Sequence, residues 1–288
     1  MMEVKMPVSP APENKEATSK EAETLATFSG RGLTSKQAIQ VDIKAAPSGS
    51  GITFHVLSTK TNSYVEIKAT ADNVVNTLRN VVLGKDGTRL CIVEHFLAAA
   101  TLWGVEDLSV TVAGLEMPLG DGSAALWTDL FEKAGIERNT PQSTVDLKEP
   151  IILTMGDRTL MALPDSKFSV HYMMDWNHPK IGKRWQSWDV TQNPSEITMA
   201  RTFGMLKDHQ MLGLENDVIS LTADGFTMPL HWDDEPVRHK LLDLVGDLAL
   251  CGINPLKIKA KFISIKGGHE IDVEMAKRLA AVLPALAN

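Results

Sequence analysis

Residues 237–248 have the sequence VRHKLLDLVGDL, and this stretch carries a structural and a chemical pattern together. Its apolar residues recur at the three- and four-residue spacing of a helix that packs one face on a core, at Leu241, Leu244, Val245 and Leu248. His239 and Asp243 are four residues apart, so on a helix they project from one face, and Asp247 lies a further turn along it. The stretch therefore predicts an amphipathic helix with a polar stripe.

The polar stripe fits two interpretations. An imidazole and a carboxylate one turn apart can share a metal ion, and a second carboxylate can hold a neighbouring group. The same His–Asp spacing is also common on exposed helix faces that bind nothing. The spacing alone leaves both the metal site and the surface helix open.

Strand and helix patterns follow in the same order in both halves of the chain. In the first half, alternation and helical periodicity predict strands at 38–43, 52–57 and 108–112, and helices at 90–103 and 123–134. In the second half they predict strands at 151–153, 159–163, 168–174 and 257–265, and helices at 235–251 and 272–283. Both halves thus predict an α+β fold built as two similar units, although no sequence repeat is evident.

The chain has one clear junction. Residues 141–150 are polar, carry two prolines and follow a helix closed by Gly135, so we place a domain boundary there. The first residues of the chain are rich in Pro, Glu, Lys, Ala and Ser and predict a flexible tail. The expected divisions are a tail at 1–23, a first α+β domain at 24–140 and a second at 141–288.

Composition limits the class of protein. The net charge is -7 and no basic block is interleaved with aromatic residues, which argues against a nucleic-acid binder. No run of about eighteen apolar residues predicts a transmembrane helix, and the N-terminus shows no signal-peptide hydrophobic region. Cys91 and Cys251 lie in apolar, helical-looking stretches, as expected of buried thiols in a reducing compartment. These features predict a cytoplasmic protein.

Two further histidines are candidates for chemistry. His95 follows Glu94 inside an otherwise apolar helix, where a buried carboxylate is costly unless it has a partner or a task. His269 follows a flexible Gly-Gly turn that could aim its side chain at a site. Each alone is more often a structural or exposed histidine. Three such ligands and one free Glu would meet the requirements of a catalytic zinc site.

Five strings, in a fixed order along the chain, resemble segments of one known family. Residues 93–99 (VEHFLAA) are similar to its T-V-E-H-L-x-A-A segment, and residues 116–125 (EMPLGDGSAA) to E-x-P-x-x-D-G-S-A-A. Residues 175–179 (DWNHP) resemble D-F-x-H-P, and residues 200–204 (ARTFG) match A-R-T-F-G. Residues 234–248 (DEPVRHKLLDLVGDL) resemble D-E-F-V-R-H-K-x-L-D-x-x-G-D-L. The family is that of the UDP-3-O-acyl-N-acetylglucosamine deacetylases of lipid A biosynthesis, and the strings cover nearly all of the chain after the tail.

The resemblance implies a fold and a metal site. The family fold is two α+β domains whose helices pack together between two outer sheets. The family's zinc ligands fall on His95, His239 and Asp243, and its general base falls on Glu94.

The resemblance also implies the remaining catalytic and binding positions. The general acid falls on His269, with Asp247 keeping that imidazole charged and oriented, and Thr202 falls on the residue that helps hold the oxyanion. The positions that fall on substrate contacts are Lys240 and Phe203, with Asp175 and Trp176 at the nucleotide end, where a ring can face the uracil.

The implied activity is zinc-dependent hydrolysis of the N-acetyl group of UDP-3-O-acyl-N-acetylglucosamine to acetate and the free amine, the committed step of lipid A biosynthesis. The expected cofactor is Zn²⁺, with Fe²⁺ left open as the metal in the cell. The expected partner is a sugar nucleotide, acylated or not, and the protein is expected to be a monomer. Two alternatives stay open: a zinc deacetylase of another N-acetylated sugar or sugar nucleotide, and a non-catalytic ligand-binding relative.

The chain departs from the family at four places. Residues 30–36 (GRGLTSK) occupy the place of the family's G-x-G-L-H-T-G turn, so Thr34 replaces a histidine. Residues 267–270 (GGHE) occupy the place of S-G-H-A, so Glu270 lies beside the expected general acid. The glycine-rich stretch after A-R-T-F-G, which in the family helps form the acyl-chain passage, is shortened to residues 211–217, and the connection before Gly267 is a few residues longer. None of these changes removes a zinc ligand, so they bear on substrate recognition and, through the charge of Glu270, on protonation of the acid.

Overall fold

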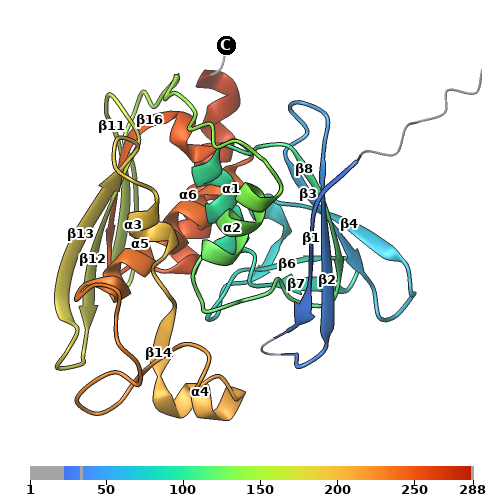
Figure 1. The fold of residues 1–288 in the computed structure, drawn as a ribbon. Coiled ribbons are helices and arrows are strands. Elements are labelled where there is room, and N and C mark those ends of the chain that lie inside the picture. The colour runs from blue at the N-terminus through green and yellow to red at the C-terminus, as the bar shows by residue number, and fades with distance from the viewer. Residues whose placement is uncertain (1–22, 33–34, 287–288) are drawn as a thin grey trace, which may run out of the picture.

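The computed structural model describes residues 23–32 and 35–286, and it has the predicted α+β fold. Almost all of the predicted tail, and Thr34, lie outside the described residues. Two sheets enclose a layer of helices (Figure 1). The arrangement of helices between outer sheets, which the resemblance implied, is therefore present.

The first sheet comes from the N-terminal half and has the strand order β1-β2-β8-β3-β4. Its strands are β1 (Thr24–Arg31), β2 (Ala38–Ala45), β3 (Ile52–Leu57), β4 (Tyr64–Lys68) and β8 (Leu108–Ala113). Strands β3 and β8 run parallel, and the other neighbouring pairs are antiparallel.

The second sheet repeats this topology in the C-terminal half, with the order β10-β11-β16-β12-β13. Its strands are β10 (Ile151–Met155), β11 (Arg158–Pro164), β12 (Ser169–Trp176), β13 (Gly182–Asp189) and β16 (Ile258–Ile265), and β9 (Val145–Asp146) also pairs with β16. Here too only the central pair on this path, β12 and β16, is parallel. The common order and strand directions give the two halves the similar build that the sequence predicted.

Four helices lie between the sheets (Figure 1): α1 (Glu94–Trp103), α2 (Ala125–Lys133), α5 (Glu235–Leu248) and α6 (His269–Leu286). In each half, an additional segment lies in the chain between the edge strand and the helix that follows it, which is α1 in the first half and α5 in the second. In the first half it contains η1 (Ala71–Asn73), β5 (Val74–Asn76), β6 (Val82–Lys85) and β7 (Thr88–Cys91). In the second half it contains α3 (Ser195–Thr198), β14 (Phe203–Met205), α4 (Leu206–Leu212) and β15 (Ile219–Leu221). Two short 3₁₀ turns, η2 (Ala249–Cys251) and η3 (Pro255–Lys257), follow α5.

One hydrophobic core joins the two halves. A single cluster of buried side chains includes Val41 and Phe54 of the first sheet, Val170 and Phe262 of the second, and Leu244 of α5 between them. The division into domains at residue 140 therefore stays a prediction. Within the described residues, no helix is both long and apolar enough to cross a membrane.

Several predicted helix boundaries were wrong. The helix expected at 90–103 begins only at Glu94, because Leu90 and Cys91 pair with β6 as part of β7. The helix expected at 235–251 ends at Leu248 and continues as the 3₁₀ turn η2, which places Cys251 outside an α-helix. The last helix begins three residues earlier than expected, at His269, and ends three residues later, at Leu286.

The surface-helix interpretation of residues 237–248 is also wrong. Helix α5 is buried on nearly all sides, and its polar residues His239, Asp243 and Asp247 are at most 2% exposed. Such burial is costly for ionisable groups unless they are paired or bind a ligand. The polar stripe therefore faces another helix, not solvent.

That helix is α1, and a glycine sets how closely the two approach. A methyl group added at Gly246 of α5 would overlap the backbone carbonyl oxygen of Glu94 and lie 3.3 Å from the Cβ of Ala98. Only a residue without a side chain fits at this crossing. The first turn of α1 is thereby held directly against the polar stripe of α5.

We expect Gly246→Ala to destabilise the protein, although alanine is the better helix former by about 1 kcal/mol. Overpacking at a helix crossing should lower the free energy of unfolding by about 1–3 kcal/mol, measured by thermal or urea denaturation. Gly225→Ala is the matched control, because an added methyl there meets only Thr222 Oγ1 at 3.6 Å. A Gly246→Ala protein more stable than the wild type would contradict the close crossing.

Candidate metal centre

The chain enters α1 through an unusual backbone conformation at Ile92. Ile92 has a positive φ of 62°, which is rare for a β-branched residue and marks local strain. Its backbone N–H donates to Asn80 Oδ1 at 3.3 Å. The turn at Ile92 redirects the chain from β7 into α1 and places Glu94 and His95, both at most 3% exposed, at the helix start.

His95, His239 and Asp243 form a compact buried trio. Nε2 of His95 lies 3.5 Å from Asp243 Oδ1, and Nε2 of His239 lies 3.3 Å from the same oxygen. The two imidazole rings are 5.0 Å apart between centroids and almost perpendicular, at 82°. One ligand atom from each residue lies within 4.8 Å of the others, so the trio could hold a single metal ion.

The hydrogen bonds around the trio fit a metal site. Nδ1 of His239 donates to the backbone carbonyl of Ala200 at 3.0 Å, which leaves Nε2 free to act as a ligand. Burial lowers the pKa of His239 to about 4, so its imidazole is neutral. Lys240 Nζ donates to Asp243 Oδ2 at 2.5 Å, whereas Asp243 Oδ1 is buried and has no hydrogen-bond partner among the described residues. An orphaned carboxylate oxygen facing two imidazole nitrogens is the donor set that a metal ion would satisfy.

Glu94 lies beside the trio and is buried. Its Oε2 accepts a hydrogen bond from the backbone N–H of Val81 at 3.1 Å. Burial raises the pKa of Glu94, and the nearby His269 and His95 only partly oppose this effect. A carboxylate with a raised pKa is a better proton acceptor at neutral pH than a solvated one.

His269 and Asp247 form a buried pair at the start of α6. Lys266 has a positive φ of 55° just before Gly267 and Gly268, and the turn brings His269 back over α5. Nδ1 of His269 donates to Asp247 Oδ2 at 2.7 Å. Burial alone would lower the pKa of His269, but the Asp247 carboxylate raises it to about 10. The imidazole is therefore charged in the absence of metal.

A pocket of about 560 Å³ opens onto these groups. Nine of the predicted site residues line it: Glu94, His95, Trp176, Thr202, Phe203, His239, Lys240, Asp243 and His269. Asp247 is fully buried and reaches the pocket only through His269. Trp176 meets Phe203 edge-on, with ring centroids 5.0 Å apart. The pocket does not include Asp175, whose carboxylate pairs with Lys266 at 3.2 Å instead.

One wall of the pocket is apolar and was not predicted residue by residue. A small buried cluster separate from the main core is formed by Ile92, Leu119, Leu214 and Val218. All four of these residues line the pocket. Segment 211–217 thus contributes Leu214 to a surface that suits an aliphatic group.

Sequence reasoning also missed Asp272. This carboxyl group is fully buried on the first turn of α6, and neither of its oxygens has a hydrogen-bond partner among the described residues. Burial and the neighbouring Asp247 raise its pKa well above the ordinary value. The predicted helix began at Asp272, and an acidic residue is ordinary at a helix start, so the sequence carried no signal of its burial.

Glu270, the departure beside His269, is directed to a different partner. Its carboxylate pairs with Arg158 Nη2 at 2.6 Å, and its side chain is 58% exposed. The main groups that shift the pKa of His269 are Asp247, Asp243 and Lys240. The extra charge is therefore largely compensated by Arg158.

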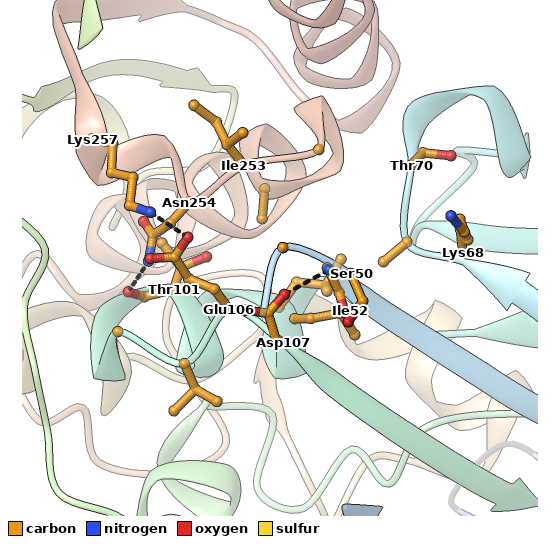
Figure 2. A pocket seen from close by; sticks show the side chains of 18 of the residues that line it. Ser50, Ile52, Lys68, Thr70, Thr101, Glu106, Asp107, Ile253, Asn254 and Lys257 are labelled. Atoms are coloured by element: carbon orange, nitrogen blue, oxygen red, sulfur yellow. Dashed lines mark hydrogen bonds and ion pairs between the residues drawn. The ribbon is translucent and has the colours of Figure 1, made fainter. Parts of the chain in front are cut away.

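A second cavity, of about 630 Å³, lies at the opposite end of α1 (Figure 2). It contains the ion pair of Lys257 with Glu106, at 2.6 Å, and the buried bond from Asn254 to the Thr101 carbonyl, at 3.0 Å. None of the predicted site residues lines this cavity.

The fold and the site together define an α+β protein with a buried candidate centre for one metal ion. The chain belongs to the UDP-3-O-acyl N-acetylglycosamine deacetylase family, whose model matches residues 21–281. It is 31% identical over 265 residues to a UDP-3-O-acyl-N-acetylglucosamine deacetylase of Thermosynechococcus vestitus, covering 88% of this chain and 91% of the relative. It is 33% identical over 278 residues to one of Nostoc sp., covering 91% and 97%. The family resemblance drawn from the sequence is confirmed.

The trio predicts a loss of metal in Asp243→Ala. Because Asp243 supplies the oxygen that both imidazoles face, removing it should lower the affinity of the purified protein for divalent metal by at least about 10-fold. Metal content measured by elemental analysis after dialysis checks this. Asp175→Ala, outside the pocket, should keep the wild-type content, and unchanged metal in Asp243→Ala would show that the trio is not the site.

The pair of His269 and Asp247 predicts a titration in the metal-free protein. NMR should show His269 protonated through neutral pH, and Asp247→Asn should lower its pKa by more than about one unit. Since the folded pKa of about 10 exceeds the ordinary value of 6.5, the pair stabilises the fold fully below about pH 6.5. That contribution is lost as the pH rises through about 10. An imidazole that titrates near 6.5 in the wild type would contradict the pairing.

Proposed function

We propose that this chain is a zinc-dependent hydrolase that removes the acetyl group from the nitrogen of UDP-3-O-acyl-N-acetylglucosamine, in lipid A biosynthesis. The observation that carries the proposal is the buried trio of His95, His239 and Asp243, with Glu94 and His269 opening onto the same pocket. Membership of the deacetylase family supports the reaction and its substrate class. Two imidazoles and one carboxylate suit zinc, and Fe²⁺ would also accept this donor set.

Glu94 is the proposed general base. Zinc held by the trio would activate a water molecule and polarise the amide carbonyl. Glu94 is adjacent in the chain to the ligand His95, lines the pocket and has a raised pKa. Its carboxylate is therefore suited to take the proton of the attacking water.

His269 is the proposed general acid. Its Nδ1 is held by Asp247, so Nε2 is the nitrogen left to deliver a proton to the departing amine. Pairing with Asp247, which raises the pKa of His269 to about 10 in the metal-free protein, favours a charged ring that can donate this proton. Thr202, which also lines the pocket, is the proposed donor to the developing oxyanion.

The walls of the pocket suggest how the substrate is held. The apolar cluster of Ile92, Leu119, Leu214 and Val218 is suited to the 3-O-acyl chain. Lys240 and the edge-on pair of Trp176 and Phe203 line the rest of the pocket and are proposed to contact the sugar nucleotide. Asp175 is proposed to act only from the periphery, since Lys266 binds its carboxylate. A cytoplasmic location and a monomeric state stay predictions.

The test is acetate release by the zinc-loaded protein, with UDP-3-O-acyl-N-acetylglucosamine compared with plain UDP-N-acetylglucosamine. We expect a preference for the acylated substrate of at least about 100-fold in kcat/KM, because an apolar wall gains about 0.8 kcal/mol for each buried CH₂ group. Glu94→Ala should keep its zinc and lose turnover. Equal use of both substrates would point to a different sugar deacetylase, and no turnover of either would remove the proposed reaction.

A further inference from the structure

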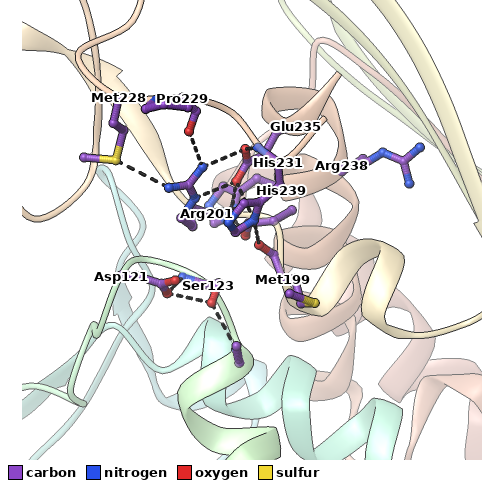
Figure 3. Close-up of polar contacts among 12 residues, drawn as sticks. Asp121, Ser123, Met199, Arg201, Met228, Pro229, His231, Glu235, Arg238 and His239 are labelled. Carbon is purple, nitrogen blue, oxygen red and sulfur yellow. Dashed lines mark hydrogen bonds and ion pairs between the residues drawn. The ribbon is translucent and has the colours of Figure 1, made fainter. Parts of the chain in front are cut away.

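The carboxylate of Glu235, at the start of α5, is fully buried and fully engaged. Arg201 donates two hydrogen bonds to it, from Nε to Oε1 at 2.8 Å and from Nη2 to Oε2 at 3.0 Å. The backbone N–H of Arg201 donates to Oε1 at 3.0 Å, and that of His231 donates to Oε2 at 2.6 Å. Figure 3 shows this network at the N-terminal end of α5, where Arg201 also donates to the Pro229 carbonyl at 2.8 Å.

The network holds the segment that carries two contacts of the site. On one side of Arg201, the Ala200 carbonyl accepts the bond from Nδ1 of His239, one helical turn beyond Glu235. On the other side, Thr202 donates its backbone N–H to the Gly122 carbonyl at 2.8 Å. A methyl group at Gly122 would overlap the Thr202 side chain, so the two backbones lie in close contact. Segment 200–202 is therefore clamped between α5 and the loop at Gly122.

We propose that Glu235, acting through Arg201, is a positioning residue for this site: it fixes the 200–202 segment so that Thr202 faces the pocket and His239 keeps its ligand nitrogen free. The inference rests on the proposed function for the part played by Thr202. The part that concerns His239 rests on its hydrogen bond to the Ala200 carbonyl and not on the proposed reaction. Groups that orient a metal ligand or a catalytic side chain in this way affect metal affinity and activity by about 10- to 100-fold.

A neighbouring ion pair provides a matched control. Asp234 precedes Glu235 and pairs with Arg238 at 2.7 Å on the same helix. Arg238 points away from the network in Figure 3. Asp234 also accepts from Gln186 at 2.6 Å, so its carboxylate bonds to β13 and to α5 rather than to segment 200–202. We therefore expect Asp234→Asn to remove a charge at the same helix end without loosening segment 200–202.

The experiment compares Glu235→Gln, Asp234→Asn and the double variant Arg201→Met/Glu235→Gln with the wild-type chain. For Glu235→Gln we expect kcat to fall about 10- to 100-fold with KM changed less than about 2-fold, because Thr202 acts in the transition state. Zinc affinity, measured by competition with a chelator, should fall about 10-fold. Asp234→Asn should keep kcat and zinc affinity within about 2-fold of wild type.

The double variant separates positioning from simple stabilisation. Removing both charges relieves the uncompensated buried charge left by a single change, so the melting temperature should recover relative to Glu235→Gln. Positioning predicts that kcat and zinc affinity stay low, since the side-chain clamp on residue 201 is then absent. Recovery of kcat together with the melting temperature, or an equal loss in Asp234→Asn, would overturn the proposal.

The zinc measurement keeps this test separate from the proposed reaction. If the wild-type chain released no acetate, the proposed function would fail, and the zinc affinities of Glu235→Gln and Asp234→Asn would still decide the alignment of His239. Equal zinc affinities in those two variants would overturn the positioning of His239 whatever the activity.

Discussion

The close crossing of α1 and α5 is the constraint on which the site depends. At Gly246 the two helices approach until no side chain fits between α5 and the carbonyl of Glu94. Helices usually pack about 8–10 Å apart, with side chains between their axes. Where a glycine removes that spacer, groups from both helices share one small space. His95 of α1 can therefore meet His239 and Asp243 of α5 around a common point.

Burial at this crossing acts on every carboxyl group in the same direction, and the partners make the outcomes different. Burial favours the neutral form of Asp243, yet His239 and Lys240 hold its pKa well below the ordinary value. Glu94 has weaker partners, so burial prevails and its pKa is raised. One buried environment thus yields an ionised carboxylate suited to a metal and another suited to accept a proton. The free-energy cost of burying these ionisable groups points to a ligand or a reaction that uses them.

Local patterns made much of this site predictable. His239 and Asp243 are one helical turn apart, and Glu94 is a carboxyl group in an apolar run. Spacing and composition therefore already identified these residues as candidates for the site. The bond between Arg201 and Glu235 joins residues 34 positions apart, and no periodicity reports such a contact. The turn at Ile92 was missed for another reason. Its positive φ is imposed by the surrounding structure against the preference of a β-branched residue, so propensity pointed to a continuous helix from Leu90.

The repeated topology gives the buried trio and the walls of the pocket different structural supports. Helices α1 and α5 occupy equivalent places, since along the chain each follows an edge strand and precedes a central strand of its sheet. The segments inserted before them are also equivalent, residues 71–91 in one half and 195–221 in the other, and both line the pocket. The helices are restrained by the core and by their close crossing, whereas the inserted segments are partly exposed, as at Leu78 and Met211. Changes in segment 211–217 can therefore reshape the apolar wall while leaving His95, His239 and Asp243 where the crossing puts them.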